Sequence, residues 1–209
     1  MSESDGTTGD AGEHESERPE RGRDAVERRL TEATADLLAE VGPEQLSIRT
    51  VSKKAQVNSG QVYHYFGSKD ALLQAGMRRL AENHFEHMRG RHHAIRLLAD
   101  ERYWRALGHT VLDGADDLFR LEIEAGISMP LGYIRNEAAN AGGTLDAEQA
   151  ARALANVALT LGWATFEPFL LALINEVPDP PSRDDLRQAI AKLLDEQMES
   201  WADPPENGS

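Results

Sequence analysis

The chain has 209 residues, enough for one domain or for a small domain joined to a larger one. Its 36 acidic and 22 basic side chains give a formal net charge of −14, which argues against a generally basic nucleic-acid coat protein or a polybasic membrane binder. The absence of cysteine excludes disulfides, thiolate metal sites and cysteine nucleophiles. A local basic patch remains compatible with this total, so the distribution of charge matters more than its sum.

The sequence contains no apolar run that approaches the roughly 20 residues needed to cross a bilayer. The longest uninterrupted apolar run covers residues 169–174. Residues 1–23 are rich in Gly, Ser, Thr and charged side chains, lack the apolar core of a signal peptide, and are expected to form a disordered acidic tail. We therefore expect a soluble, cytoplasmic protein with no membrane partner.

From Asp24 onward the apolar residues recur with helical spacing and no segment keeps the period of a strand, so we predict an all-α fold. Asp24 and Glu27 have capping-box spacing and open the first helix, which Gly42 and Pro43 end. Ser47 and Asn58 are predicted to cap two short helices that follow. The helices expected in this half cover residues 24–41, 48–55, 59–65 and about 69–85.

Short helices are expected around residues 103–111, 118–121 and 129–134, after an undecided stretch at 86–99 in which we expect a bend. Asp146 and Gln149 have capping-box spacing and open the longest helix, which runs to about residue 176. Pro168 should kink that helix because proline removes a backbone donor. A last helix is predicted over residues 182–201, with Ser182 as its cap.

Acidic residues are absent from the 25 residues between Glu44 and Asp70. The basic residues in this stretch are Arg49, Lys53, Lys54 and Lys69. Because these four positive charges are part of a net charge of −14, the rest of the chain carries a net charge of −18. A functionless basic helix pair would account for the charge alone. The same stretch is also rich in hydroxyl, amide and aromatic side chains, which contact phosphates and base edges. Two short helices with such groups on the second are what a helix-turn-helix requires.

The run VNSGQVYHYF at residues 57–66, followed by GSKD at 67–70, closely resembles the DNA-binding domain of TetR-type transcriptional regulators. The resemblance extends without gaps over residues 26–73. It implies a three-helix helix-turn-helix domain over residues 24–72, followed by a larger helical effector-binding and dimerisation domain over 73–209.

Two positions depart from the family pattern. Gln56 stands at a turn position that is usually glycine, and a non-glycine residue in a left-handed turn costs about 1 kcal/mol. Gln61 stands where a smaller Thr, Ser or Ala is usual, so its longer amide could reach a base edge directly.

The resemblance implies DNA contacts on both short helices. Base contacts in the major groove are implied for Arg49, Ser59, Gly60, Gln61 and Tyr63, and phosphate contacts for Ser47, Thr50, Tyr63, His64, Tyr65 and Lys69. Asn58, the predicted cap of the second short helix, joins this DNA-binding set. Val57, Val62 and Phe66 are predicted to be core, and core packing is the alternative for Tyr65. Arg18, Arg21 and Arg23 of the tail are candidates for a minor-groove contact.

Nearly the whole circumference of the helix expected at 154–174 is apolar. Asn156, Thr160 and Glu167 fall within about 40° of one another, and only Thr165 lies opposite. Such a helix needs burial on two sides, against the core and against a second subunit. The resemblance implies a homodimer through helices 146–176 and 182–201, with its recognition helices roughly 34–36 Å apart or further.

A small-molecule effector, apolar or amphipathic, is also implied by the resemblance. Candidate lining residues are Trp104, His109, Phe119, Met129, Tyr133, Trp163 and Phe166, although ordinary core packing would explain each of them. Histidines cluster at His84, His87, His92 and His93. Because cysteine and paired carboxylates are missing, we predict exposed histidines and neither a metal site nor a cofactor.

The function predicted from the sequence is therefore a sequence-specific transcriptional regulator, a ligand-responsive repressor that binds a palindromic operator in double-stranded DNA as a dimer. A transcriptional activator of the same fold is the alternative within this class. A helical enzyme and a DNA-independent interaction module are rivals from other classes. We expect no catalytic residues, because the sequence contains no nucleophile elbow, zinc-protease motif, phosphate loop or Glu-x-x-His pair.

Overall fold

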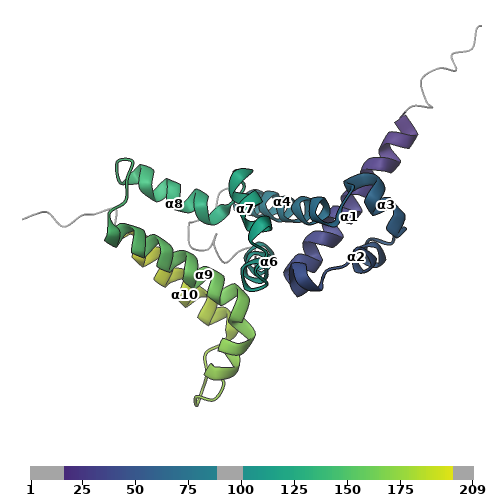
Figure 1. Ribbon diagram of the computed structural model, residues 1–209. Coiled ribbons are helices and arrows are strands. Elements are labelled where there is room, and N and C mark those ends of the chain that lie inside the picture. The colour runs from purple at the N-terminus through teal and green to yellow at the C-terminus, as the bar shows by residue number, and fades with distance from the viewer. Residues whose placement is uncertain (1–16, 89–100, 200–209) are drawn as a thin grey trace, which may run out of the picture.

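The structure, a computed structural model, describes residues 17–88 and 101–199 of the chain. Within these two ranges the chain is helical and has no strand, which confirms the predicted all-α fold. Helices α2 and α3 form one end of the molecule and α8, α9 and α10 form the other, with α6 and α7 between them (Figure 1). Expectations for residues 1–16, 89–100 and 200–209 lie outside the described residues.

Helix α1 (Glu17–Gln45) begins seven residues before the predicted start at Asp24, so the expectation of disorder is wrong for residues 17–23. The predicted stop is confirmed, because Gly42 leaves the helical conformation at φ 79° and ψ 172° and only one turn follows it. A Cβ at residue 42 would lie 2.7 Å from Oδ2 of Asp113 and 2.9 Å from Cβ of His109. Both the backbone angle and this close approach require glycine.

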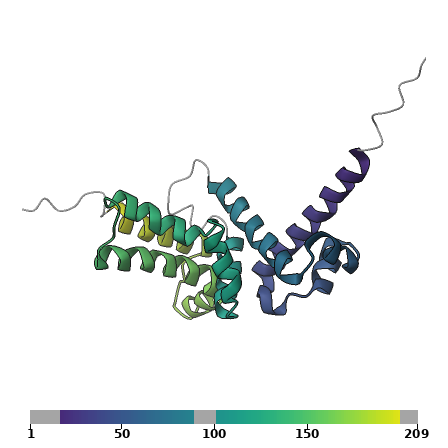
Figure 2. The ribbon, with the colours of Figure 1, turned by 45° about the horizontal axis from the view of Figure 1, so that its top comes forward.

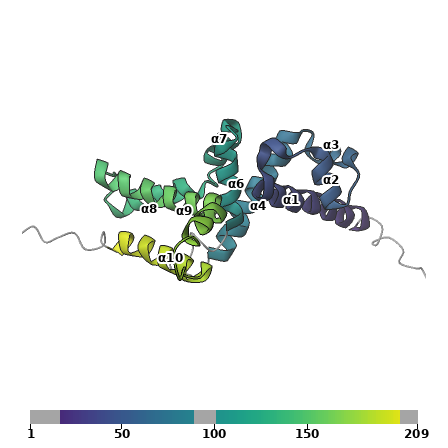
Figure 3. The same ribbon diagram turned by 90° about the horizontal axis from the view of Figure 1, so that it is seen from below.

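Helices α2 (Ile48–Ala55), α3 (Ser59–Phe66) and α4 (Lys69–Met88) follow where the sequence predicts them. Helix α2 packs on α1, and α3 packs on α2 and α4, around the fully buried side chains of Val51, Val62 and Leu72. Figure 2 shows α1 and α4 diverging from this unit, α4 toward the larger domain. Figure 3 shows α2 and α3 together at the end of the molecule opposite α8–α10.

Helices α6 (Glu101–Leu112), α7 (Asp116–Glu124) and α8 (Met129–Asn140) correspond to the three short helices predicted. Helix α6 contacts both α1 and α9 and so joins the two parts of the molecule. The prediction that His84 is exposed is wrong, because this side chain is fully buried, with its ring centroid 5.3 Å from that of Tyr103 and 6.0 Å from that of Trp104. The position of His84 on the inner face of α4 explains its burial.

Helix α9 (Ala147–Ile174) begins with the predicted capping box. Asp146 Oδ1 accepts from the Gln149 backbone N–H at 2.9 Å, and Gln149 Oε1 accepts from the Asp146 backbone N–H at 2.7 Å. Helix α10 (Arg183–Glu199) begins one residue after Ser182, as predicted. The last turns of α9, around the internal Pro168, leave the direction of its first turns in Figure 1, as the predicted kink requires.

Candidate nucleic-acid interface

Two hydroxyl residues fix the start of α2. Ser47 Oγ accepts from the Thr50 backbone N–H at 3.1 Å, and Thr50 Oγ1 accepts from the Ser47 backbone N–H at 3.0 Å. Both side chains are exposed, and no acidic residue occupies the first turn. The N-terminus of α2 therefore holds two hydroxyls beside unpaired backbone N–H groups, which is a suitable arrangement for a phosphate.

The turn between α2 and α3 has the left-handed residue that the sequence predicts. Gln56 adopts φ 57° and ψ 45°, and the next residue, Val57, donates its N–H to the Ser52 carbonyl at 3.0 Å. Asn58 then caps α3, because its Oδ1 accepts from the Gly60 N–H at 2.8 Å. This bond uses the Asn58 carbonyl for structure and leaves its exposed NH₂ group as a donor.

One face of α3 is buried and the other is exposed. Val62 is fully buried and Phe66 is half-buried, as expected for core positions. The predicted DNA-binding residues on the outer face are Ser59, Gly60, Tyr63 and His64, all exposed, with Tyr63 60% exposed. Gln61 and Tyr65 are half-buried at the edges of this face. The exposed side of α3 is therefore polar, small near its N-terminus and free of carboxylates.

No contact among the described residues requires glycine at position 60. A Cβ added there would meet only Asn58 Oδ1, at 3.4 Å, which is an ordinary contact. Glycine inside a helix destabilises it by roughly 0.5–1 kcal/mol relative to alanine. The absence of a side chain at Gly60 leaves room for another surface to approach the backbone of α3.

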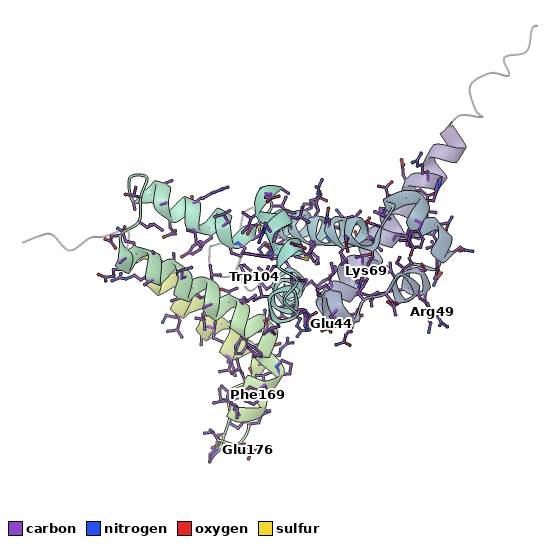
Figure 4. All side chains as sticks on the ribbon, viewed as in Figure 1. Glu44, Arg49, Lys69, Trp104, Phe169 and Glu176 are labelled. Atoms are coloured by element: carbon purple, nitrogen blue, oxygen red, sulfur yellow. The ribbon has the colours of Figure 1, made fainter. Side chains whose placement is uncertain are left out.

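The basic residues of the acid-free stretch divide into two groups. Lys54 turns back toward α1, with its Nζ 2.5 Å from Glu40 Oε1 and 3.6 Å from Asp36 Oδ2. The half-buried Lys69 donates from Nζ to the Pro43 carbonyl at 3.2 Å, which leaves two of its three N–H donors for the phosphate role that the resemblance implies. Arg49 and Lys53 are exposed, and Figure 4 shows Arg49 at the outer edge of α2.

Another cation reaches this surface from α1. The Arg23 guanidinium carbon lies 5.9 Å from the ring centroid of Tyr65, a cation–π distance. Sequence reasoning placed Arg23 in a disordered tail and omitted Lys53 from the DNA-binding set. The position of Lys53 in the acid-free stretch could have indicated that it belongs to this surface. The position of Arg23 follows from the early start of α1, which the sequence pattern did not predict.

The comparisons with known proteins point in the same direction. Residues 30–75 match the family of bacterial regulatory proteins described as the tetR family. The HTH-type transcriptional repressor Rv3405c of Mycobacterium tuberculosis is 30% identical over 186 residues, which cover 83% of this chain and 92% of that protein. The chain belongs to the TetR family.

A second regulator sequence and a solved structure are also similar to this TetR-family chain. The HTH-type transcriptional regulator BetI of Stenotrophomonas maltophilia is 43% identical over 63 residues, 30% of this chain and 32% of that protein. The crystal structure of a transcriptional regulator from Rhodococcus sp. Rha1 matches with a TM-score of 0.59 at 24% identity, covering 83% of this chain and 96% of the other. The family match and the repressor relative confirm the predicted DNA-binding transcriptional regulator with a TetR-type helix-turn-helix. The relatives are transcriptional regulators, which are not enzymes.

Three polar residues in the middle and second half of α9 turn inward in this TetR-family chain. Asn156, Thr160 and Glu167 are all buried; Asn156 donates from Nδ2 to Tyr133 Oη at 2.9 Å, and Arg183 donates to both oxygens of Glu167 at 2.8 and 2.6 Å. The hydrogen bond from Arg183, with the charges of that residue and of two other arginines, holds the pKa of Glu167 below its usual value.

The outer face of α9 is apolar and exposed. Its exposed large side chains are Leu154, Leu159, Phe166, Phe169, Leu170 and Leu173, and Leu193 of α10 is exposed as well. By length and composition alone α9 could cross a membrane, with a mean hydropathy of 1.7 in its most apolar window. The sequence expectation that no segment is apolar enough to cross a bilayer is therefore wrong for α9, as far as length and composition go. A contiguous exposed apolar face of this kind marks an interaction surface.

Among the described residues, no cavity is lined by all seven of the residues predicted to line an effector site. Trp104, Met129 and Trp163 are buried, His109 and Tyr133 are half-buried, and Phe119 and Phe166 are exposed. Trp163 and Phe166 share an open apolar depression of about 440 Å³ on the outer face of α9. Among the described residues, no group of three side chains is arranged to hold a metal ion.

A buried carboxyl between α6, α7 and α8 has no counterpart among the predicted residues. Tyr103 donates its O–H to Glu122 Oε1 and accepts from the Met129 backbone N–H at 3.1 Å. Burial raises the pKa of Glu122 to about 7, against a smaller lowering by the Tyr103 hydrogen bond. Burial and the neighbouring Glu122 charge raise the pKa of Tyr103 well above its ordinary value.

Proposed function

We propose that this chain is a ligand-responsive repressor that binds a palindromic operator in the cytoplasm as a homodimer. The name of the Mycobacterium tuberculosis relative, a transcriptional repressor, supports repression over activation, which remains the second candidate. The acid-free surface of α2 and α3 supports operator binding, because it is the part of an otherwise acidic chain that a polyanion can approach without repulsion.

The observation that carries the dimer proposal is the exposed apolar face of α9. Phe169 is 62% exposed and Leu173 53% exposed in the single chain, while Asn156, Thr160 and Glu167 of the same helix are buried. Contiguous apolar surface of this kind is characteristic of an interface. A twofold partner would cover it with its own copy of the face, together with α10, and would place two α3 helices against one palindrome.

Two matched variants test this proposal. Phe169→Asp places a charge on the outer face of α9, whereas Leu112→Asp places one on α6 at a side chain with the same exposed fraction, 62%. Sedimentation velocity should show a dimer for the parent and for Leu112→Asp, and a monomer for Phe169→Asp. The monomer should also bind a palindromic operator at least tenfold more weakly, because each half-site contact would form independently.

The proposal fails if the parent chain is a monomer, or if Phe169→Asp remains a dimer with unchanged operator affinity. Circular dichroism of each variant checks that the helices remain folded. Weakened operator binding by both variants alike would point to a general loss of structure and would also count against α9 as the interface.

A further inference from the structure

A cleft of about 840 Å³ lies between α4 and α7. Leu73 and Leu118 are buried beneath it, and Leu121 is half-buried. The charged residues around it are Asp70, Asp116, Asp117, Glu124 and Arg120, all exposed. A smaller cavity of about 60 Å³ shares Gln74, Leu118 and Leu121 with the cleft and is also lined by Glu122 and Arg78. The volume of the cleft is that of a small-molecule site.

Helix dipoles alone account for several of these acidic residues. Asp70 lies in the first turn of α4, and Asp116 and Asp117 in the first turn of α7, where a carboxylate is stabilising without any ligand. Glu122 lies near the other end of α7, so the dipole disfavours a negative charge there. A structural role at a helix N-terminus therefore does not explain Glu122.

Glu122 also lacks a full set of partners. Its side chain is only 2% exposed, and while Oε1 accepts from Tyr103, Oε2 has no hydrogen-bond partner among the described residues. A buried carboxylate oxygen without a donor is costly, and such groups are normally satisfied by protein, water or ligand. Oε2 belongs to a side chain that lines the smaller cavity, next to the apolar base of the cleft.

We propose that this cleft binds a small organic cation, with its apolar body against Leu73, Leu118 and Leu121 and its ammonium or guanidinium group donating to Glu122 Oε2. This inference rests on the proposed function, since it makes the cleft the effector site of the repressor. The charges favour a cation over an anion, because the described lining of the cleft and the smaller cavity together has five carboxylates, one of them Glu122, against the two cations Arg120 and Arg78. The cleft includes none of the seven effector-lining residues expected from the sequence.

The walls of the cleft continue into the two contacts that hold the chain leading to α2. On one wall, Gly114 follows Asp113, whose Oδ2 accepts from the Glu44 backbone N–H at 3.1 Å. On the other, Asp70 follows Lys69, whose ammonium donates to the Pro43 carbonyl. A ligand that shifts either wall therefore acts directly on the segment that positions the helix-turn-helix.

Three probes with one apolar body and different charges test the site. We would titrate the full chain at pH 8, without DNA, with 4-phenylbutylamine, the neutral 4-phenylbutanol and the anionic 4-phenylbutyrate, using calorimetry. The amine should bind at least tenfold more tightly than either of the others. Glu122→Gln should weaken amine binding at least tenfold and Asp117→Asn about two- to threefold, while Glu176→Gln, at the far end of α9 (Figure 4), should change nothing.

Equal binding of the three probes, no binding of the amine, or unchanged amine affinity in Glu122→Gln would overturn the proposal. Glu122→Gln retains an acceptor for Tyr103, and the exposed Asp117 gives a second variant that does not disturb the core. The amine should also weaken operator binding, and Asp113→Ala should retain amine binding while reducing that effect. Operator binding without amine binding would refute only the proposal that the cleft binds a cation. Failure to bind any DNA would refute the proposed repressor function.

Discussion

Replacing Glu122 by glutamine should make the protein more stable at pH 8 than the parent. The pKa of the buried carboxyl is about 7 in the folded chain, against 4.5 in the unfolded chain. The native state therefore keeps a proton that the unfolded state releases, so the free energy of unfolding falls as pH rises from 4.5 to 7. A difference of about 2.5 pKa units, at 1.36 kcal/mol per unit, corresponds to roughly 3 kcal/mol lost above pH 7.

Glu122→Gln removes this loss, because the amide stays neutral at every pH while its oxygen can still accept from Tyr103. Urea unfolding followed by circular dichroism, at one protein concentration and at pH 5, 6, 7 and 8, measures the difference between variant and parent. We expect that difference to grow with pH to about 3 kcal/mol. Glu124→Gln, an exposed change on the same helix, is the control for loss of a charge. A constant difference, or a variant that is less stable at pH 8, would refute the reasoning.

Three further outcomes follow from the described contacts. Lys53→Ala should reduce the slope of log K against log salt for DNA binding by about 0.9. Lys54→Ala, which loses an ion pair with α1, should leave the slope unchanged. Equal slopes for both variants would contradict the assignment of Lys53 to the DNA and Lys54 to α1. Gln61→Ala should change the preferred base at one position of each half-site, seen by sequencing selected duplexes, and an unchanged preference would remove Gln61 from base recognition. Gly108→Ala should destabilise the fold by about 1–3 kcal/mol in urea melts, because its Cβ would lie 2.1 Å from Thr165 Oγ1. Adding Thr165→Ala should restore part of this loss. Wild-type stability of Gly108→Ala would contradict the close packing of α6 against α9.

The helix boundaries that the sequence predicted correctly depend on local chemistry. The caps of α2 and α9 form between residues at most four positions apart: Ser47 accepts from a backbone N–H of the first turn of α2, and Asp146 and Gln149 cap α9. The local sequence pattern is therefore enough to place both helix starts. The left-handed backbone conformation of Gln56 was predicted from the family resemblance, in which this turn position is usually glycine. The polar stripe of α9 was also readable, since helical periodicity places its members on one face whatever they contact.

The features that sequence reasoning missed depend on contacts between distant segments. Lys54 is one of the four basic residues of the acid-free stretch, and nothing local indicates its ion pair, because its partner Glu40 lies 14 residues away on another helix. His84 lies against α6, across the undecided stretch, so nothing local indicated its burial. Glu122 occupies an ordinary position in a charged helix, and only the packing of α6 and α8 around it makes its carboxyl exceptional.

The central claim is that α3 presents its exposed face to a palindromic DNA site in a dimer. Selection from a random duplex library by the purified full chain at moderate salt, followed by sequencing, tests that claim most directly. The account predicts an enriched palindrome whose half-sites lie at least one helical turn apart, and loss of the enrichment in Phe169→Asp. Enrichment of a single unpaired half-site, binding without sequence preference, or no binding to any duplex would contradict it.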